Sequence, residues 1–241
     1  MTEQIQSHPT RFEVTKWFGP QTASVQLPDD ATNALLKMTD SIVESKKSES
    51  HGQSLAGVID SELRVYKSDM ENAGVDQLLE SCVKSYISHC AKQHGVWDEN
   101  LTFTTGINSA WVVSQYENEY NPIHNHTGCE LSGVLYLKTP NVKGRRNIVS
   151  KQGKAEGDGD INFFYSAASQ RNYDIFEKGL VQITPTPGLL LMFPSYLLHT
   201  VYPFVGEGER RCIAFNAGYR ITKENKGAGE VLAGNMQGIK N

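Results

Sequence analysis

The chain has 241 residues, of which 39% are hydrophobic and 21% are charged, and its formal net charge is -4. This is the composition of an ordinary globular protein with enough residues for a sizeable core, so it excludes a low-complexity or disordered chain. The 23 basic and 27 acidic residues are scattered without a basic stripe. Nucleic acid is therefore not the expected partner.

Membrane and secretory signals are not visible in the sequence. No apolar run reaches the length that spans a bilayer, and the polar residues 1–9 lack the apolar stretch of a secretory signal. The four cysteines lie far apart and without metal-binding spacing, which favours reduced thiols (Cys82, Cys90, Cys129 and Cys212). We therefore expect a cytoplasmic protein without a membrane partner. The sequence leaves its oligomeric state open, with a homodimer among the alternatives.

The first hundred residues predict mixed structure. Residues 12–18 predict a strand, and Asp29 and Asp30 then precede apolar residues at helical spacing, which are Leu35, Leu36, Met38 and Ile42. The polar residues 45–53 predict a loop. A second helix is predicted over residues 74–93, with its apolar stripe packed on the outside of a sheet.

From residue 102 the pattern changes to short apolar segments separated by Gly, Pro and Asn turns, which is typical of a β-sandwich or barrel. Strands are predicted over residues 107–116, 131–137, 161–165, 180–183, 188–193 and 212–218. Residues 141–160 are rich in Gly, Lys and acidic side chains and predict an exposed insertion. We expect one α+β domain, with residues 1–100 as support, 101–220 as the strand-rich core and 221–241 as a C-terminal tail.

Three histidines are the candidate metal ligands. His124 and His126 stand at i and i+2, so both side chains leave the same face if the segment is extended. His199 closes the apolar segment 189–198, and a barrel can bring it beside the first pair. Three ligands on one face leave open positions for a bidentate organic acid and O2, as non-haem Fe(II) oxygenases require. The remaining histidines are interpreted as ordinary core or surface residues (His8, His51, His89 and His94).

Four sequence blocks follow one another between residues 106 and 219. The pair His124-x-His126 precedes SGVLYL, residues 132–137; GLLLMFPS, residues 188–195, leads to His199; and RRCIAFN begins at Arg210. In this order the blocks resemble the 2-oxoglutarate/Fe(II) oxygenases, especially the prolyl-hydroxylase-like branch and its uncharacterised bacterial and phage relatives. The resemblance covers nearly half of the chain and implies a double-stranded β-helix, a jelly-roll or cupin-like barrel, with the N-terminal helices packed outside it.

The resemblance also implies a metal site formed by His124, His126 and His199. Its second ligand is usually a carboxylate, whereas this chain has His126 at that position, and Glu130 is the nearest carboxylate that could replace it. A neutral imidazole in place of a carboxylate leaves the site one charge more positive, which strengthens its attraction for anionic ligands.

A cosubstrate site follows from the same resemblance. Arg210 matches the arginine that grips the C5 carboxylate of 2-oxoglutarate through two charge-assisted hydrogen bonds, and Arg211 takes this role if the register is shifted by one residue. Tyr136 and Tyr116 match positions that face the cosubstrate, although an aromatic side chain packed in the barrel explains each of them equally well.

The implied activity is a hydroxylation in which 2-oxoglutarate is decarboxylated to succinate while an unidentified small molecule or protein side chain is oxidised. The implied cofactors are Fe(II), 2-oxoglutarate and O2, with ascorbate as a stimulant. The residues that select the substrate are expected in 141–160, in 166–177 and in the N-terminal third.

Two alternatives stay open at this point. His124, His126 and Glu130 also have the H-x-H-x3-E spacing of a cupin, which would use a metal without 2-oxoglutarate. The other alternative is a β-barrel binding or structural protein whose histidines hold a metal only for stability. Arg210 argues against both, because neither gives a buried guanidinium an anionic partner.

Overall fold

The computed structural model describes residues 12–15, 19–45, 48–52, 57–96, 100–142, 157–165, 179–225 and 228–233. The first part of the chain supplies β1 (Phe12–Thr15), β2 (Thr22–Gln26), α1 (Asp29–Ser45), β3 (Ser61–Val65), α2 (Lys67–Ala73) and α3 (Asp76–Gln93). The strands that follow are β4 (Leu101–Gln115), β5 (Asn121–His124), β6 (Leu131–Lys138), β7 (Asn141–Val142), β8 (Ile161–Phe164), β9 (Leu180–Ile183), β10 (Leu189–Pro194), β11 (Leu198–Val201), β12 (Gly206–Glu207), β13 (Arg210–Asn225) and β14 (Ala228–Ala233).

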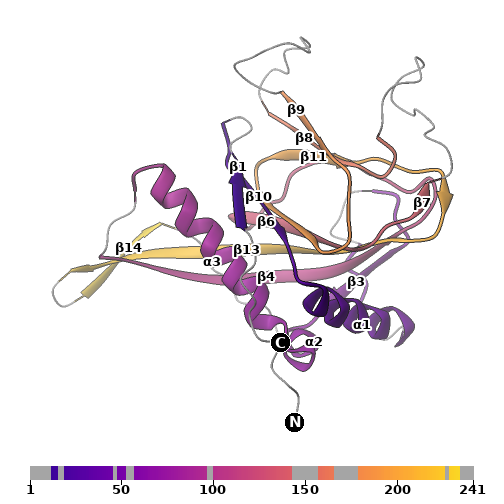
Figure 1. Ribbon diagram of the computed structural model, residues 1–241. Helices are drawn as coiled ribbons and strands as arrows, with labels where there is room; N and C mark the ends of the chain where they lie inside the picture. Colours follow the sequence, from indigo (N-terminus) through magenta and orange to yellow (C-terminus); the bar gives the residue numbers. More distant parts are fainter. Residues whose placement is uncertain are drawn as a thin grey trace.

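Two antiparallel sheets form the body of the molecule. The large sheet has the order β1-β2-β10-β6-β13-β4-β3, with β14 paired to β13, and the small sheet has the order β5-β11-β8-β9. A separate two-stranded sheet joins β12 to β7. Figure 1 shows β8, β9 and β11 on one side of the long strands β4 and β13, and α1 and α2 on the other. This arrangement is the expected α+β double-stranded β-helix with helices outside the barrel.

The central strands of the large sheet are buried on both faces, so one hydrophobic core lies on each side of the sheet. Along β6, Val134 and Tyr136 face the barrel interior, whereas Leu135 and Leu137 face the helices. Strand side chains alternate between the two faces, and here both faces exclude water. This double burial explains why residues 131–137 read as an uninterrupted apolar segment.

The two long helices cover the outer face of the large sheet. The acidic residues Asp29 and Asp30 occupy the first turn of α1, where a negative charge interacts favourably with the helix dipole. The buried stripes of the helices are Leu35, Met38 and Ile42 in α1 and Leu79, Val83 and Ile87 in α3. Both helices predicted from apolar spacing are therefore confirmed. No helix in the described ranges combines the length and the hydrophobicity that a membrane crossing needs.

The observed bounds of the strands differ from the predicted ones in segments where only one face of the strand is buried. β4 begins at Leu101 rather than at residue 107, and its first half alternates between buried and more exposed side chains. β13 continues to Asn225 and pairs with β14, so part of the expected C-terminal tail, residues 221–225 and 228–233, is β-structure. A search for continuous apolar runs therefore misses the ends of β4 and β13, where polar side chains interrupt the apolar pattern.

Three further strands and a short helix also escaped prediction: β2, β3, β11 and α2. The strands are only four or five residues long and mix apolar with polar side chains, so their periodicity is weak. Residues 1–100 thus add β1, β2 and β3 to the large sheet instead of only supporting it. Most of the expected insertion, residues 143–156, and all of 166–177 lie outside the described residues.

Gly133 lies in β6 at the point where the large sheet is most tightly packed. It is paired with Phe215 of β13, and a Cβ atom added at Gly133 would lie 2.2 Å from Cζ of the Phe215 ring. Phe215 is fully buried in the core beneath the helices. A side chain at position 133 therefore has no room unless this ring moves.

We expect Gly133→Ala to lower the free energy of unfolding by about 1–3 kcal/mol, the usual cost of adding atoms to a packed core. Urea denaturation followed by circular dichroism measures the change. The double variant Gly133→Ala/Phe215→Leu should lose less stability than the two single substitutions added together, because the smaller side chain admits the methyl group. Additive losses would show that the contact with Phe215 is not the cause.

Candidate functional site

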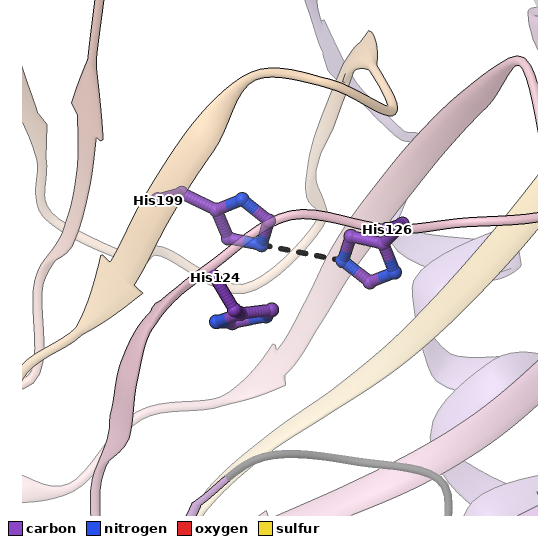
Figure 2. Close-up of side chains that lie close together, drawn as sticks. All are labelled: His124, His126 and His199. Atoms are coloured by element: carbon purple, nitrogen blue, oxygen red, sulfur yellow. Dashed lines mark hydrogen bonds between the residues drawn. The ribbon is translucent and has the colours of Figure 1, made fainter.

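Three histidines converge at one end of the barrel. His124 ends β5, His199 lies in β11 directly opposite it in the strand pairing, and His126 follows two residues after His124. The backbone N–H of His126 donates to the Ser195 carbonyl at 2.9 Å, which ties the segment after β5 to the end of β10. One ring nitrogen from each histidine lies within 4.8 Å of the others, a spacing that could hold a metal ion. Figure 2 shows the three imidazoles facing one another.

The hydrogen bonds around these rings direct their Nε2 atoms toward a common point. Nδ1 of His124 lies 2.7 Å from the Pro122 carbonyl, and Nδ1 of His199 lies 2.9 Å from the Leu197 carbonyl. A carbonyl oxygen can only accept, so in both rings Nδ1 carries the proton and Nε2 keeps its lone pair. Partners of this kind fix the tautomer and orientation of metal-binding histidines in many proteins.

His126 is held in a similar way by Asn216 of β13. The side-chain hydrogen bond from Asn216 raises the pKa of His126, as expected for an acceptor of an imidazole N–H. The Ser132 hydroxyl donates to Asn216 Oδ1 at 2.8 Å and fixes that amide. In Figure 2 one nitrogen of His126 faces His199 and the other points away. Nε2 of His126 is thus the ring nitrogen that lies beside His199.

Burial keeps the imidazoles of His126 and His199 uncharged. Desolvation, followed by the proximity of His124, lowers the pKa of His126 to about 4 and that of His199 well below its usual value. Nε2 of His126 lies only 3.3 Å from Nε2 of His199. Neutral imidazoles with converging lone pairs are the donors that a divalent transition metal prefers, so the set fits Fe(II).

Arg210 lies in the same cavity without a carboxylate partner among the described residues. It is 1% exposed, and its guanidinium donates to Gln115 Oε1 at 2.7 Å and to the Tyr136 hydroxyl at 3.2 Å. Its Nε has no hydrogen-bond partner in the described part of the chain. A buried guanidinium with a free donor is costly unless an anion binds it.

Arg211 projects from the opposite face of β13. Its guanidinium forms ion pairs with Glu209, at 2.6 Å from Nε to Oε1, and with Asp40 of α1. Lys138 joins this network through the same two carboxylates. Because Arg211 is already neutralised on the helix side of the sheet, it lies away from the cavity that Arg210 enters.

The remaining residues singled out from the sequence occupy different places. Tyr136 is fully buried, and its ring centroid lies 4.9 Å from Cζ of Arg210. Tyr116 follows the end of β4, is 47% exposed and does not line the cavity. Glu130 is not one of the three residues whose ligand atoms converge. At the end of β4 it is thus Gln115, and not Tyr116, that reaches Arg210.

One cavity, open to solvent at its mouth, joins these groups. The three imidazoles and Arg210 line it together with apolar side chains such as Trp111, Val113 and Phe193. Glu62 of β3 and Asn121 of β5 add oxygen acceptors to the same lining. A largely apolar cavity with a few converging polar groups is the usual form of a small-molecule site.

Several of these groups were not identified from the sequence. Asn216 and Ser132 lay within the recognised blocks, and Asn216 is six residues after Arg210, so strand alternation alone could have placed it on the same face. Gln115 was visible only as the end of an apolar strand. Glu62 lies in a strand that was not predicted, and no sequence signal marks it.

Comparisons with known proteins agree with this geometry. Residues 109–216 match the profile of a family described as putative 2OG-Fe(II) oxygenase. No curated protein sequence matches the chain. The fold is similar to a prolyl hydroxylase from Trichoplax adhaerens, solved with a peptide of hypoxia inducible factor, at 17% identity and a TM-score of 0.52 over 85% of this chain and 82% of that one.

Two solved structures from nogalamycin biosynthesis share the fold as well. The non-haem α-ketoglutarate-dependent epimerase SnoN has 10% identity and a TM-score of 0.51 over 86% of this chain and 80% of that one. The carbocyclase SnoK has 8% identity and a TM-score of 0.50 over 84% and 81%. At these identities the likeness concerns the fold alone.

Glu62 has an unusual electrostatic position in the cavity wall. Burial, followed by repulsion from Glu119, raises its pKa to about 7. In the unfolded chain the carboxyl titrates near its ordinary value of 4.5. Between these two values the folded protein binds more protons at Glu62 than the unfolded chain does, so stability is lost as the pH rises through this window.

Between pH 4.5 and pH 7 we expect the free energy of unfolding of the original protein to fall by on the order of 2–3 kcal/mol more than that of Glu62→Gln. Urea denaturation at half-unit pH steps measures the free energy of unfolding of both proteins. The difference between the two proteins reports on Glu62, because the other titratable groups contribute equally to both. Parallel curves for the two proteins would show that Glu62 titrates normally in the folded state.

Proposed function

We propose that this chain is a hydroxylase of the dioxygenase type that uses Fe(II) and 2-oxoglutarate with O2, since residues 109–216 match the profile of the putative 2OG-Fe(II) oxygenases. In this proposal His124, His126 and His199 hold the metal, and Arg210 holds 2-oxoglutarate. The observation that carries it is a buried guanidinium, without a carboxylate partner in the described residues, in the same cavity as three imidazoles whose ring nitrogens converge.

Arg210 is arranged to receive the distal carboxylate of the cosubstrate. Gln115 and Tyr136 hold the guanidinium in place, and Nε remains available. Binding a carboxylate would compensate the buried positive charge and satisfy that donor. The phenol of Tyr136 is the second group in position to support the same carboxylate, because burial raises its pKa and keeps it protonated.

Fe(II), 2-oxoglutarate and O2 supply the oxidising chemistry when bound, with 2-oxoglutarate converted to succinate and CO2. The chain itself orients the ligands. The Pro122 and Leu197 carbonyls fix the tautomers of His124 and His199, and Asn216 does the same for His126. The apolar lining limits the access of water, which strengthens every electrostatic contact inside the cavity.

Hydroxylation is the preferred reaction because the sequence blocks resemble the prolyl-hydroxylase-like branch most closely. The fold does not determine this outcome, since similar barrels are found in an epimerase and a carbocyclase. The substrate stays a small molecule or a protein side chain. Mass spectrometry of a converted substrate distinguishes the two reactions, because hydroxylation adds one oxygen atom whereas epimerisation leaves the mass unchanged.

The metal site predicts a specific spectroscopic result. Anaerobic addition of Fe(II) and 2-oxoglutarate to the metal-free protein should produce a visible charge-transfer band, because the cosubstrate chelates the metal. We expect His199→Ala to abolish the band, since only two imidazoles remain. A protein that binds Fe(II) but shows no band at saturating 2-oxoglutarate would instead favour a cupin-type metalloenzyme that does not use this cosubstrate.

The two adjacent arginines offer a matched pair of variants. Arg210→Lys should raise the Kd for 2-oxoglutarate by about 10- to 100-fold, because the planar fork is lost and one charge-assisted hydrogen bond with it. Arg211→Lys keeps its ion pairs on the helix side and should change this Kd by less than about twofold. Titration of the charge-transfer band measures both. Equal effects of the two substitutions would contradict the role assigned to Arg210.

A further inference from the structure

The cavity contains a second buried charged side chain, Glu62, for which the proposed metal and cosubstrate sites provide no role. The register of β3, β4 and β13 pairs Glu62 with Val113 and Val113 with Cys212. Val113 and Cys212 both belong to the core inside the barrel. Paired residues of antiparallel strands share a face, so Glu62 also points inward, and it lines the cavity directly.

The carboxylate of Glu62 lacks a compensating charge within the described residues. The residue is 6% exposed, and its Oε1 has no hydrogen-bond partner there. The charged group that most affects it is another carboxylate, Glu119. Arg64, two residues along β3, lies beside Glu49 instead, at 3.9 Å from Nε to Oε2. Burying a carboxylate without a donor is unfavourable, so this position is suited to a donor brought by a ligand.

Asn121 provides a second acceptor in the same lining. Its Oδ1 is buried and has no hydrogen-bond partner among the described residues. The Trp111 ring lines the cavity beside these acceptors and lies between His51, at 4.7 Å between ring centroids, and His126, at 6.2 Å. An aromatic wall of this kind excludes water from the polar groups beside it.

From this arrangement we infer that Glu62 and Asn121 form the substrate subsite, and that the group it binds is a primary ammonium. The substrate is then an amine, such as an amino acid or a lysyl side chain, held by Glu62 while a nearby carbon faces the three histidines. This inference rests on the proposed function, in which Arg210 is occupied by the 2-oxoglutarate carboxylate. The cavity thus has a cationic pole for the cosubstrate and an anionic pole for the substrate.

The test compares butylammonium with butan-1-ol, which has the same chain length and no charge, as ligands of the full-length metal-free protein at matched ionic strength. The chain has three tryptophans, so the indole N–H signal of Trp111 can be assigned by replacing each tryptophan with Phe in turn. Chemical-shift titration of this signal measures Kd at the cavity itself. We expect butylammonium to bind at least about 10-fold more tightly than butan-1-ol, as a charged hydrogen bond requires.

Glu62→Gln should remove this preference, because the amide keeps the shape of the side chain but loses the charge. Glu80→Gln, which removes an exposed carboxylate from α3, is the matched control and should keep the preference. The charge-transfer titration of Glu62→Gln with Fe(II) and 2-oxoglutarate should stay within about twofold of the original protein, which also shows that the variant is folded.

Equal binding of the two probes, or a preference for butylammonium that persists in Glu62→Gln, would overturn the ammonium subsite. Neither result involves a metal, so the proposed oxygenase activity would be unaffected. Conversely, absence of the charge-transfer band in the original protein would count against the proposed function, while the ammonium titration would still report on Glu62.

Discussion

Strand β13 lies near the centre of the large sheet, between β4 and β6, and over residues 210–218 both of its faces are largely buried. Successive side chains of β13 therefore point alternately into the barrel and into the core beneath the helices. Arg210 and Asn216 enter the barrel, where one contacts Tyr136 and the other orients His126. Arg211 enters the opposite side and is neutralised by Glu209 and Asp40. A shift of one residue in this register would exchange the two environments and dismantle the cavity.

The metal site depends on the same framework, because its three rings come from segments that the sheets bring together. His124 and His199 are paired directly across β5 and β11, so the small sheet fixes their separation. His126 lies beyond β5 and is positioned by Ser195 and Asn216, which belong to the large-sheet side. The junction of the two sheets is thus the place where the three ring nitrogens converge, and burial keeps His126 and His199 neutral.

Charge is distributed unevenly around this junction. The positive charge of Arg210 is held without a carboxylate partner, and the carboxylate of Glu62 without a cationic one, among the described residues. Each is unfavourable by itself in a cavity of low polarity. Pairing the two charges with each other, or replacing both residues by apolar side chains, would favour the stability of the folded protein. Their separation within one cavity is the feature on which the proposed binding of two ligands of opposite charge rests.

The sequence by itself determined the elements that are buried on both faces, such as β6 and β10, because continuous apolar runs reveal them. It also singled out His124, His126, His199 and Arg210, which stand within a recognisable order of blocks and which the structure brings to one cavity. Only the tertiary structure decided between Arg210 and Arg211 as the cavity side chain, and only it brought Glu62 to the cavity. The reason is physical: the register between strands far apart in the chain sets which face a side chain occupies, and local periodicity does not encode that register.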